Sequence, residues 1–236
     1  MLRFYAMKIA DALKNVLEDI RISALNAGRD ANEVKLITVS KTVDIQRVME
    51  AVNAGTTILG ENRVQEAKEK ITNFPLAEKK VEWHMIGNLQ KNKAKTAVAL
   101  FDLIHSVNST ELAAELNKHA NNAGIVQNVL VQVKLSDEPA KHGALEKDLM
   151  ELLNSVMGMD NLKLLGLMTI PPFFADPEEA RPYFKKLRQI AETASAKGFP
   201  VKELSMGMSN DYKIAIEEGA TMVRVGTAIF GARNNL

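Results

Sequence analysis

The feature that most constrains the fold of this chain is a repeated alternation of short apolar runs with segments of helical periodicity. Eight runs rich in Val, Ile and Leu predict β-strands, because such runs, separated by turn-forming residues, are typical of buried strands. The predicted strands are Val34–Ser40, Thr56–Leu59, Val81–Ile86, Asp102–Val107, Val126–Leu135, Leu162–Ile170, Lys202–Met206 and Thr221–Val225. Strands separated by helices pair in parallel, and eight such units close a (β/α)₈ TIM barrel.

Helical segments separate these strands, and one extra helix, predicted over Met7–Ala27 with Gly28 as its stop, precedes the first strand. The others are Asp44–Ala54, Val64–Ile71, Lys91–Leu100, Thr110–Asn122 (capped by Ser109 and ended near Gly124), Leu145–Val156, Pro177–Lys197 and Asp211–Glu218 (capped by Asn210 or Ser209), with a short terminal segment Thr227–Gly231. The alternative is an open, doubly wound sheet. No G-x-G-x-x-G follows the first strand, which weakens a dinucleotide-binding version of that fold.

Length and composition favour one soluble domain. The 236 residues suit a single barrel, which typically needs about 250, and no linker-like stretch divides the chain, so we expect one domain over residues 1–236. Thirty basic residues against 29 acidic ones give a net charge of +1, which does not favour nucleic acid. The absence of cysteine excludes disulfides and thiolate chemistry. No apolar run approaches the roughly 20 residues that cross a bilayer. We expect a cytoplasmic protein with no membrane or nucleic-acid partner.

Polar and glycine-rich residues follow the predicted strands, at the end of a barrel where chemistry takes place. Lys41 follows the first strand and is either a solvated lysine, a partner of a carboxylate or phosphate, or a Schiff-base amine. The loops after strands seven and eight, "SMGMS" and "VGT", are the usual phosphate-binding positions. Their candidate ligand-binding residues are Ser205, Met206, Gly207, Ser209, Gly226 and Thr227. Asp211 argues mildly against an anion there, because its carboxylate competes with one.

Arg224 and His84 each have two interpretations. Arg224 lies within the last strand and either pairs with a carboxylate such as Glu61 or Glu203, or donates to a ligand ring. His84 alternates with Trp83, so that one side chain points into the barrel and the other outward. His84 is then either a hydrogen-bonded core histidine or a ligand contact. The other histidines, His105, His119 and His142, are scattered and have no metal-binding spacing.

Several motifs together resemble the pyridoxal 5′-phosphate (PLP) homeostasis protein family. They are "VSKT", "GENRVQEAKEK", "WHMIGNLQKNK", "GLMTIPP" and "LSMGMSNDYKIAIEEGATMVRVGTAIFGAR", which span about Leu36 to Arg233. The resemblance implies a single barrel similar to the N-terminal domain of alanine racemase (the type III fold of PLP proteins). It also implies PLP as cofactor, a part in vitamin B6 homeostasis, and no established catalytic activity.

The resemblance also implies roles for individual residues. Lys41 matches the lysine that forms the internal aldimine with PLP, and Arg224 matches the arginine near the pyridine nitrogen. Ser205 with the backbone of Met206, Gly207 and Ser209, together with Gly226 and Thr227, matches the phosphate-binding loops, and Asn62 and His84 match positions lining the cofactor. Two residues depart from the family pattern: Arg63, where tyrosine is expected, and Asn88, where proline is common.

Three functions are compatible with these residues. A PLP carrier that passes its cofactor to apo-enzymes needs only a reversible aldimine and an open cavity, and we prefer it. An amino-acid racemase of low activity is the alternative. The second base of alanine racemase is a tyrosine from a further domain across a dimer. Here only Gly231–Leu236 remain at the end of the short segment after the last strand, and Tyr5, Tyr183 and Tyr212 lie on predicted helices. A Schiff-base aldolase is the third. We expect a monomer rather than an obligate dimer.

Overall fold

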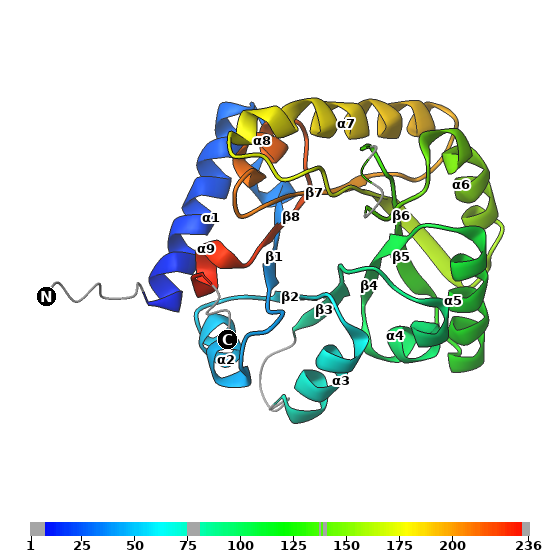
Figure 1. Cartoon of the computed structure of the whole chain (residues 1–236), viewed down its shortest axis with the longest axis horizontal. Coiled ribbons are helices and arrows are strands. Elements are labelled where there is room, and N and C mark those ends of the chain that lie inside the picture. The colour runs from blue at the N-terminus through cyan, green and yellow to red at the C-terminus, as the bar shows by residue number, and fades with distance from the viewer. Residues whose placement is uncertain (1–7, 75–80, 137, 139–140, 233–236) are drawn as a thin grey trace, which may run out of the picture.

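The computed structural model describes residues 8–74, 81–136, 138 and 141–232, and its centre is a closed barrel of eight parallel strands in sequence order (Figure 1). Each strand pairs with its two neighbours in the chain, and the first pairs with the eighth. The strands are β1 (Lys35–Val39), β2 (Ile58–Glu61), β3 (Glu82–Met85), β4 (Leu103–Val107), β5 (Gln127–Gln132), β6 (Leu162–Met168), β7 (Glu203–Met208) and β8 (Met222–Val225). The predicted TIM barrel is confirmed, and the open-sheet alternative is wrong.

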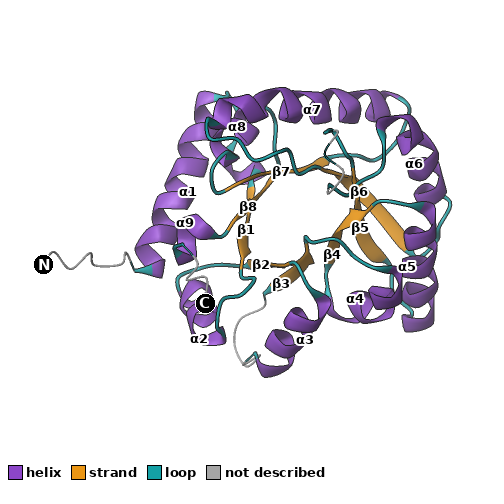
Figure 2. Cartoon of the chain, in the orientation of Figure 1, coloured by secondary structure: helices purple, strands orange, loops and turns teal. Residues whose placement is uncertain are grey.

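Helices form the outer layer around the barrel (Figure 2). They are α1 (Ile9–Asn26), α2 (Ile45–Asn53), α3 (Val64–Asn73), α4 (Ala94–Leu100), α5 (Thr110–Ala123), α6 (Leu149–Met157), α7 (Arg181–Ala196), α8 (Tyr212–Glu217) and α9 (Thr227–Phe230). The predicted extra helix is α1, which packs against α8, α9 and α2. Its predicted first residue, Met7, lies outside the described residues. None of the described helices is long and apolar enough to cross a membrane.

Several element boundaries differ from the prediction because the first turn of a helix tightens. The segments Lys91–Lys93, Glu146–Asp148 and Pro177–Ala180 are 3₁₀ turns that lead into α4, α6 and α7. The caps of α5 are confirmed: the Ser109 hydroxyl accepts from the Leu112 N–H, and Gly124 ends the helix in the left-handed region. The prediction that Asn210 or Ser209 caps the helix after β7 is wrong, since Asp211 holds that position and no side chain caps α8.

The strands have apolar side chains on both faces, which form one layer outside the barrel and one inside it. A large core lies between the barrel and the helices, whereas a smaller cluster, which includes Ile37, Leu130 and Met168, fills the barrel itself. β3 illustrates the alternation. Trp83 belongs to the outer layer and meets the ring of Phe74 edge-on at 5.6 Å, while His84 points inward, so the predicted alternation is confirmed. Buried polar side chains therefore interrupt the apolar filling of the barrel.

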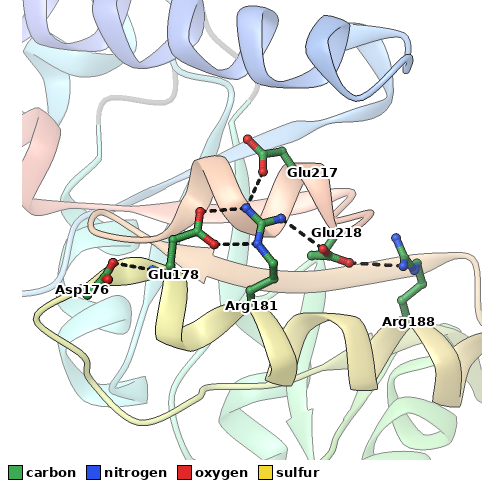
Figure 3. A network of polar contacts seen from close by, with 6 residues as sticks. All are labelled: Asp176, Glu178, Arg181, Arg188, Glu217 and Glu218. Carbon is green, nitrogen blue, oxygen red and sulfur yellow. Dashed lines mark hydrogen bonds and ion pairs between the residues drawn. The ribbon is translucent and has the colours of Figure 1, made fainter.

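An ion network joins α7 to α8 on the outside of the barrel (Figure 3). The guanidinium of Arg181 donates to Glu178 in the 3₁₀ turn that precedes α7 and to Glu217 and Glu218 at the carboxyl end of α8. Arg188, two turns further along α7, reaches the other oxygen of Glu218 at 3.2 Å. These contacts join the carboxyl end of α8 to α7, and the loop at the other end of α8 forms part of the cavity described below.

Candidate functional site

A cavity of about 640 Å³ opens at the carboxyl ends of the strands. Six of the predicted ligand-binding residues line it: Lys41, Asn62, Ser209, Arg224, Gly226 and Thr227. They come from the ends of β1, β2, β7 and β8, or just beyond them, and so meet in space although up to 186 positions of sequence separate them. The volume lies in the range of small-molecule sites, about 300–1,000 Å³.

Lys41 lies on a turn that a buried ion cluster supports. The Lys70 ammonium donates to the Ser40 carbonyl and to the carboxylates of Glu61 and Glu66. Its distance to each of the two carboxylates is 2.7 Å. Glu66 also accepts from the backbone N–H of Thr42. Thr42 has φ +60, a conformation that a β-branched residue adopts only when its surroundings impose it. The cluster therefore holds the backbone immediately beside Lys41 in a defined, strained shape.

Glu61 is the most buried member of this cluster. Its Oε1 accepts from the Ser40 hydroxyl and from Lys70, while its Oε2 is buried and has no hydrogen-bond partner among the described residues. Burial raises the pKa of the Glu61 carboxyl, and the hydrogen bonds from Lys70 and Ser40 oppose that shift. Glu61 therefore forms its ion pair with Lys70. The predicted alternative of a salt bridge between Arg224 and Glu61 is wrong.

Backbone N–H groups at the start of α9 face the end of β7. The Ser209 hydroxyl accepts from the N–H of Gly226 at 3.2 Å and of Ala228 at 3.4 Å. Gly226 lies so close to β1 that an added Cβ would be 3.1 Å from the Val39 carbonyl oxygen. These donors point at one small polar oxygen on the cavity wall, and an oxyanion is a stronger acceptor for the same groups.

Arg224 reaches the cavity from within the barrel. Its guanidinium donates to the Ser205 hydroxyl at 2.5 Å and to the Thr169 carbonyl at 2.8 Å. Burial lowers the pKa of Arg224 to about 10, and the nearby Asp211 carboxylate opposes that change. Asp211 is itself buried and accepts from the Met208 N–H, and burial raises its pKa. The other proposed partner, Glu203, pairs with Lys35 instead, so that alternative is also wrong.

Four predicted residues do not line this cavity. The Ser205 hydroxyl contacts Arg224 and His105 inside the barrel, and the Met206 side chain packs in the outer apolar layer. Gly207 has φ +89 and backs onto α8, where an added Cβ would lie 2.5 Å from that of Ala215. His84 instead borders a separate cavity of about 730 Å³, which Lys35 and Glu82 at the start of their strands also line.

Sequence reasoning missed two features of the site. The segment after β6 supplies an apolar wall that includes Ile170, Phe173 and Phe174, and Phe173 is 79% exposed. The run "PPFF" next to a strand end was the available signal. The second is His105, which is scattered from the other histidines in the sequence but whose Nε2 lies 3.1 Å from Nδ1 of His84 in the structure. The described residues contain no group of three side chains suited to a metal ion.

The two departures from the family pattern lie outside the cavity wall. Arg63 is exposed at the start of α3, and Asn88 is exposed in the loop after β3. Between them Gly87 packs so tightly on Asn62 that an added Cβ would be 2.3 Å from the Asn62 carbonyl oxygen. Because Gly87 allows this close approach, the loop after β3 fixes the backbone of Asn62 at the cavity.

Comparison with known proteins places the chain among PLP-related barrels. The family described as "Alanine racemase, N-terminal domain" matches residues 15–234. The pyridoxal phosphate homeostasis protein of Aquifex aeolicus is 43% identical over 228 residues, which cover 96% of this chain and 99% of that protein. The chain belongs to the pyridoxal phosphate homeostasis protein family.

Other members of the pyridoxal phosphate homeostasis protein family agree in sequence and in structure. The Escherichia coli K12 protein of the same name is 40% identical over 230 residues, covering 96% of this chain and 97% of the relative. The structure of Synechococcus elongatus PipY with PLP bound matches with a TM-score of 0.82 at 37% identity, over 95% of this chain and all of PipY. The family named from the sequence motifs is confirmed.

Proposed function

We propose that this chain binds PLP in the cavity at the carboxyl ends of the strands and takes part in PLP homeostasis. The observation that carries the proposal is the convergence of Lys41, Arg224 and the Gly226–Ala228 backbone on one cavity of suitable volume. The bound PLP of PipY, a relative that this chain matches over almost its whole length, supports the choice of ligand.

The residues present fit the three polar parts of PLP. The backbone N–H groups of Gly226 and Ala228, with Ser209, would hold the phosphate, because they already converge on a single acceptor oxygen. Arg224 would face the pyridine nitrogen, and Lys41 would supply the amine. When bound, PLP supplies an aldehyde that condenses reversibly with an amine, releasing water and forming a Schiff base. Asn62 completes the wall beside Lys41.

The same residues favour a carrier over an enzyme. Racemisation needs a base on each face of the bound amino acid, and of the described tyrosines neither Tyr183 nor Tyr212 lines the cavity. Tyr212 donates instead to Asp19 on α1. Arg224 also presents a permanently charged donor, which disfavours protonation of a pyridine nitrogen and weakens the cofactor as an electron sink. We propose that the protein holds PLP reversibly and passes it to PLP-dependent apo-enzymes in the cytoplasm.

Absorbance and intact mass test the binding proposal directly. The purified protein loaded with PLP is expected to be yellow, and borohydride should bleach it and add one reduced pyridoxyl group to its mass. Lys41→Ala should abolish both changes. Lys147→Ala, which removes an exposed lysine from a 3₁₀ turn on the outside of the barrel, is the matched control and should behave as the wild type. Labelling of the Lys41→Ala protein at the wild-type level would refute the assignment.

Deuterium exchange and transfer assays separate carrier from enzyme. The carrier predicts negligible exchange at Cα of alanine in D₂O, and it predicts that a PLP-dependent apo-enzyme recovers activity when mixed with the loaded protein. Exchange at ordinary enzymatic rates would refute the carrier and support the racemase-like alternative. A Schiff-base aldolase would instead catalyse condensation without a bound chromophore.

A further inference from the structure

Five polar side chains form a continuous chain through the barrel that begins at Arg224 and ends at Glu82. The Arg224 guanidinium contacts Ser205 Oγ at 2.5 Å, and Ser205 Oγ lies 2.9 Å from Nδ1 of His105. His105 Nε2 lies 3.1 Å from Nδ1 of His84, whose Nε2 lies 3.5 Å from a carboxylate oxygen of Glu82. The chain therefore connects the proposed cofactor cavity to the opposite end of the barrel.

The Arg224 end of the chain determines the direction of the hydrogen bonds in it. A guanidinium only donates, so Ser205 must accept from Arg224, and its own hydroxyl hydrogen is available for His105. If that hydrogen goes to Nδ1 of His105, Nε2 of His105 donates to His84, and the neutral His84 ring carries its hydrogen on Nε2, 3.5 Å from an acceptor oxygen of Glu82. Donation then runs from Arg224 to Ser205, from Ser205 to His105 and from His105 to His84. Each histidine is neutral, with its hydrogen on Nε2.

The reverse arrangement is disfavoured at both ends. If His105 donated from Nδ1, the buried Ser205 hydroxyl would have no acceptor among the described residues, which costs about 1–3 kcal/mol. At the other end, a bare Nε2 of His84 would face the acceptor oxygen of Glu82. The side chains of His105 and Ser205 are 0% exposed and line neither cavity, so solvent offers this central pair no replacement partners.

We propose that Ser205, His105 and His84 are positioning residues for Arg224, forming a one-directional hydrogen-bond chain that aims its guanidinium into the cavity. Ser205, assigned from the sequence to a phosphate loop, acts instead through Arg224. The inference rests on the proposed function, because Arg224 matters as the residue that faces the pyridine ring. The chain itself is a property of the protein without its cofactor and can be tested separately.

Nuclear magnetic resonance of the PLP-free, ¹⁵N-histidine-labelled protein tests the direction of the chain. At pH 7 both His84 and His105 are expected to be neutral with the hydrogen on Nε2. Assignment uses the single variants His84→Asn and His105→Asn, each of which removes one set of ring signals. An Nδ1–H tautomer or a charged ring at His105 would overturn the proposal, whatever the protein does with PLP.

A set of variants at His105 tests whether the chain positions Arg224. His105→Asn retains an acceptor near Nδ1, whereas His105→Leu removes it at similar size. His105→Leu is expected to shift the absorbance maximum of bound PLP. It should also release PLP about tenfold to a hundredfold faster, which is the change in rate that corresponds to losing one hydrogen bond to a charged group. His105→Asn should restore both, and His142→Asn, an exposed control, should change neither.

The outcomes of this experiment separate the two proposals. Equal spectra and release rates for His105→Leu and the wild type would overturn the positioning role. If His105→Leu fails to fold, Ser205→Ala, which deletes only the hydroxyl that contacts Arg224, replaces it with the same expectation. Absence of any PLP chromophore in the wild-type protein would refute the proposed function, while the tautomers measured without PLP would still decide the direction of the chain.

Discussion

Lowering the pH from 7 to 5 is expected to destabilise this protein through two buried histidines. Burial lowers the pKa of His84 from its ordinary 6.5 to about 3, and Lys35 adds to that shift. Burial, with His84 and Arg224 nearby, holds the pKa of His105 well below its ordinary value. Glu82 faces His84, but the Glu82 side chain is 56% exposed, so solvent screens its effect.

The sign and size of the effect follow from proton linkage. Both rings stay neutral in the folded protein at pH 5, whereas in the unfolded chain they protonate as the pH falls through 6.5. Their contribution to stability is therefore complete above about pH 7 and is lost progressively as the pH falls towards the folded pKa. At 1.36 kcal/mol per pH unit, each histidine removes about 2 kcal/mol between pH 7 and pH 5, and the pair removes about 4 kcal/mol.

Urea unfolding followed by circular dichroism at pH 5, 6 and 7 measures this loss. His105→Asn removes one titrating ring, so the loss of unfolding free energy between pH 7 and 5 should fall by about 2 kcal/mol relative to the wild type. His142→Asn removes an exposed ring and should leave the loss unchanged. If His105→Asn shows the same loss as the wild type, the buried ring was not kept neutral by the fold and the reasoning fails.

Three other substitutions test the packing and charges around the cavity, each by urea unfolding. Gly207→Ala should cost about 2 kcal/mol more than Gly198→Ala. Both glycines have φ near +90, but an added Cβ would lie 2.5 Å from the Cβ of Ala215 at Gly207 and would meet nothing within 4 Å at Gly198; equal costs would contradict this. Lys70→Met should lower the unfolding free energy by about 3–5 kcal/mol, because it leaves the buried Glu61 carboxylate without its partner. Adding Glu61→Leu should recover much of that loss, and no recovery would refute the pairing. Arg181→Ala should cost about 1 kcal/mol at low salt and less in 1 M NaCl, and a salt-independent cost would show that packing dominates.

The barrel and half of the site followed from local sequence patterns. Eight alternations of apolar runs with helical segments determine the strand count, and chain order then places every strand end on one rim. Lys41 and Arg224 were located in this way, because each lies at or near the carboxyl end of a strand. Alternation along β3 also predicted that His84 and Trp83 face opposite sides of the sheet, and the structure shows that His84 is the inward one.

The direction of the Ser205 side chain required information that local patterns do not contain. Strand β7 changes register against β8 between Ser205 and Met208, where Gly207 takes a positive φ. That irregularity turns Ser205 into the barrel and Ser209 towards the cavity, so two serines of one motif have different surroundings. The approach of His105 to Ser205 joins residues 100 positions apart, and it depends on how the closed barrel brings non-adjacent strands together.

The chain that ends at Arg224 has a consequence for charge movement through the barrel. A proton can hop along such a chain only if every member can reverse its bond, and a guanidinium has no lone pair with which to receive one. The hydrogen-bond chain therefore does not carry protons towards Arg224, although its polar groups are in contact with one another from His84 to Arg224. A proton taken up near Glu82 is therefore not passed along this chain to a ligand in the cavity at Arg224.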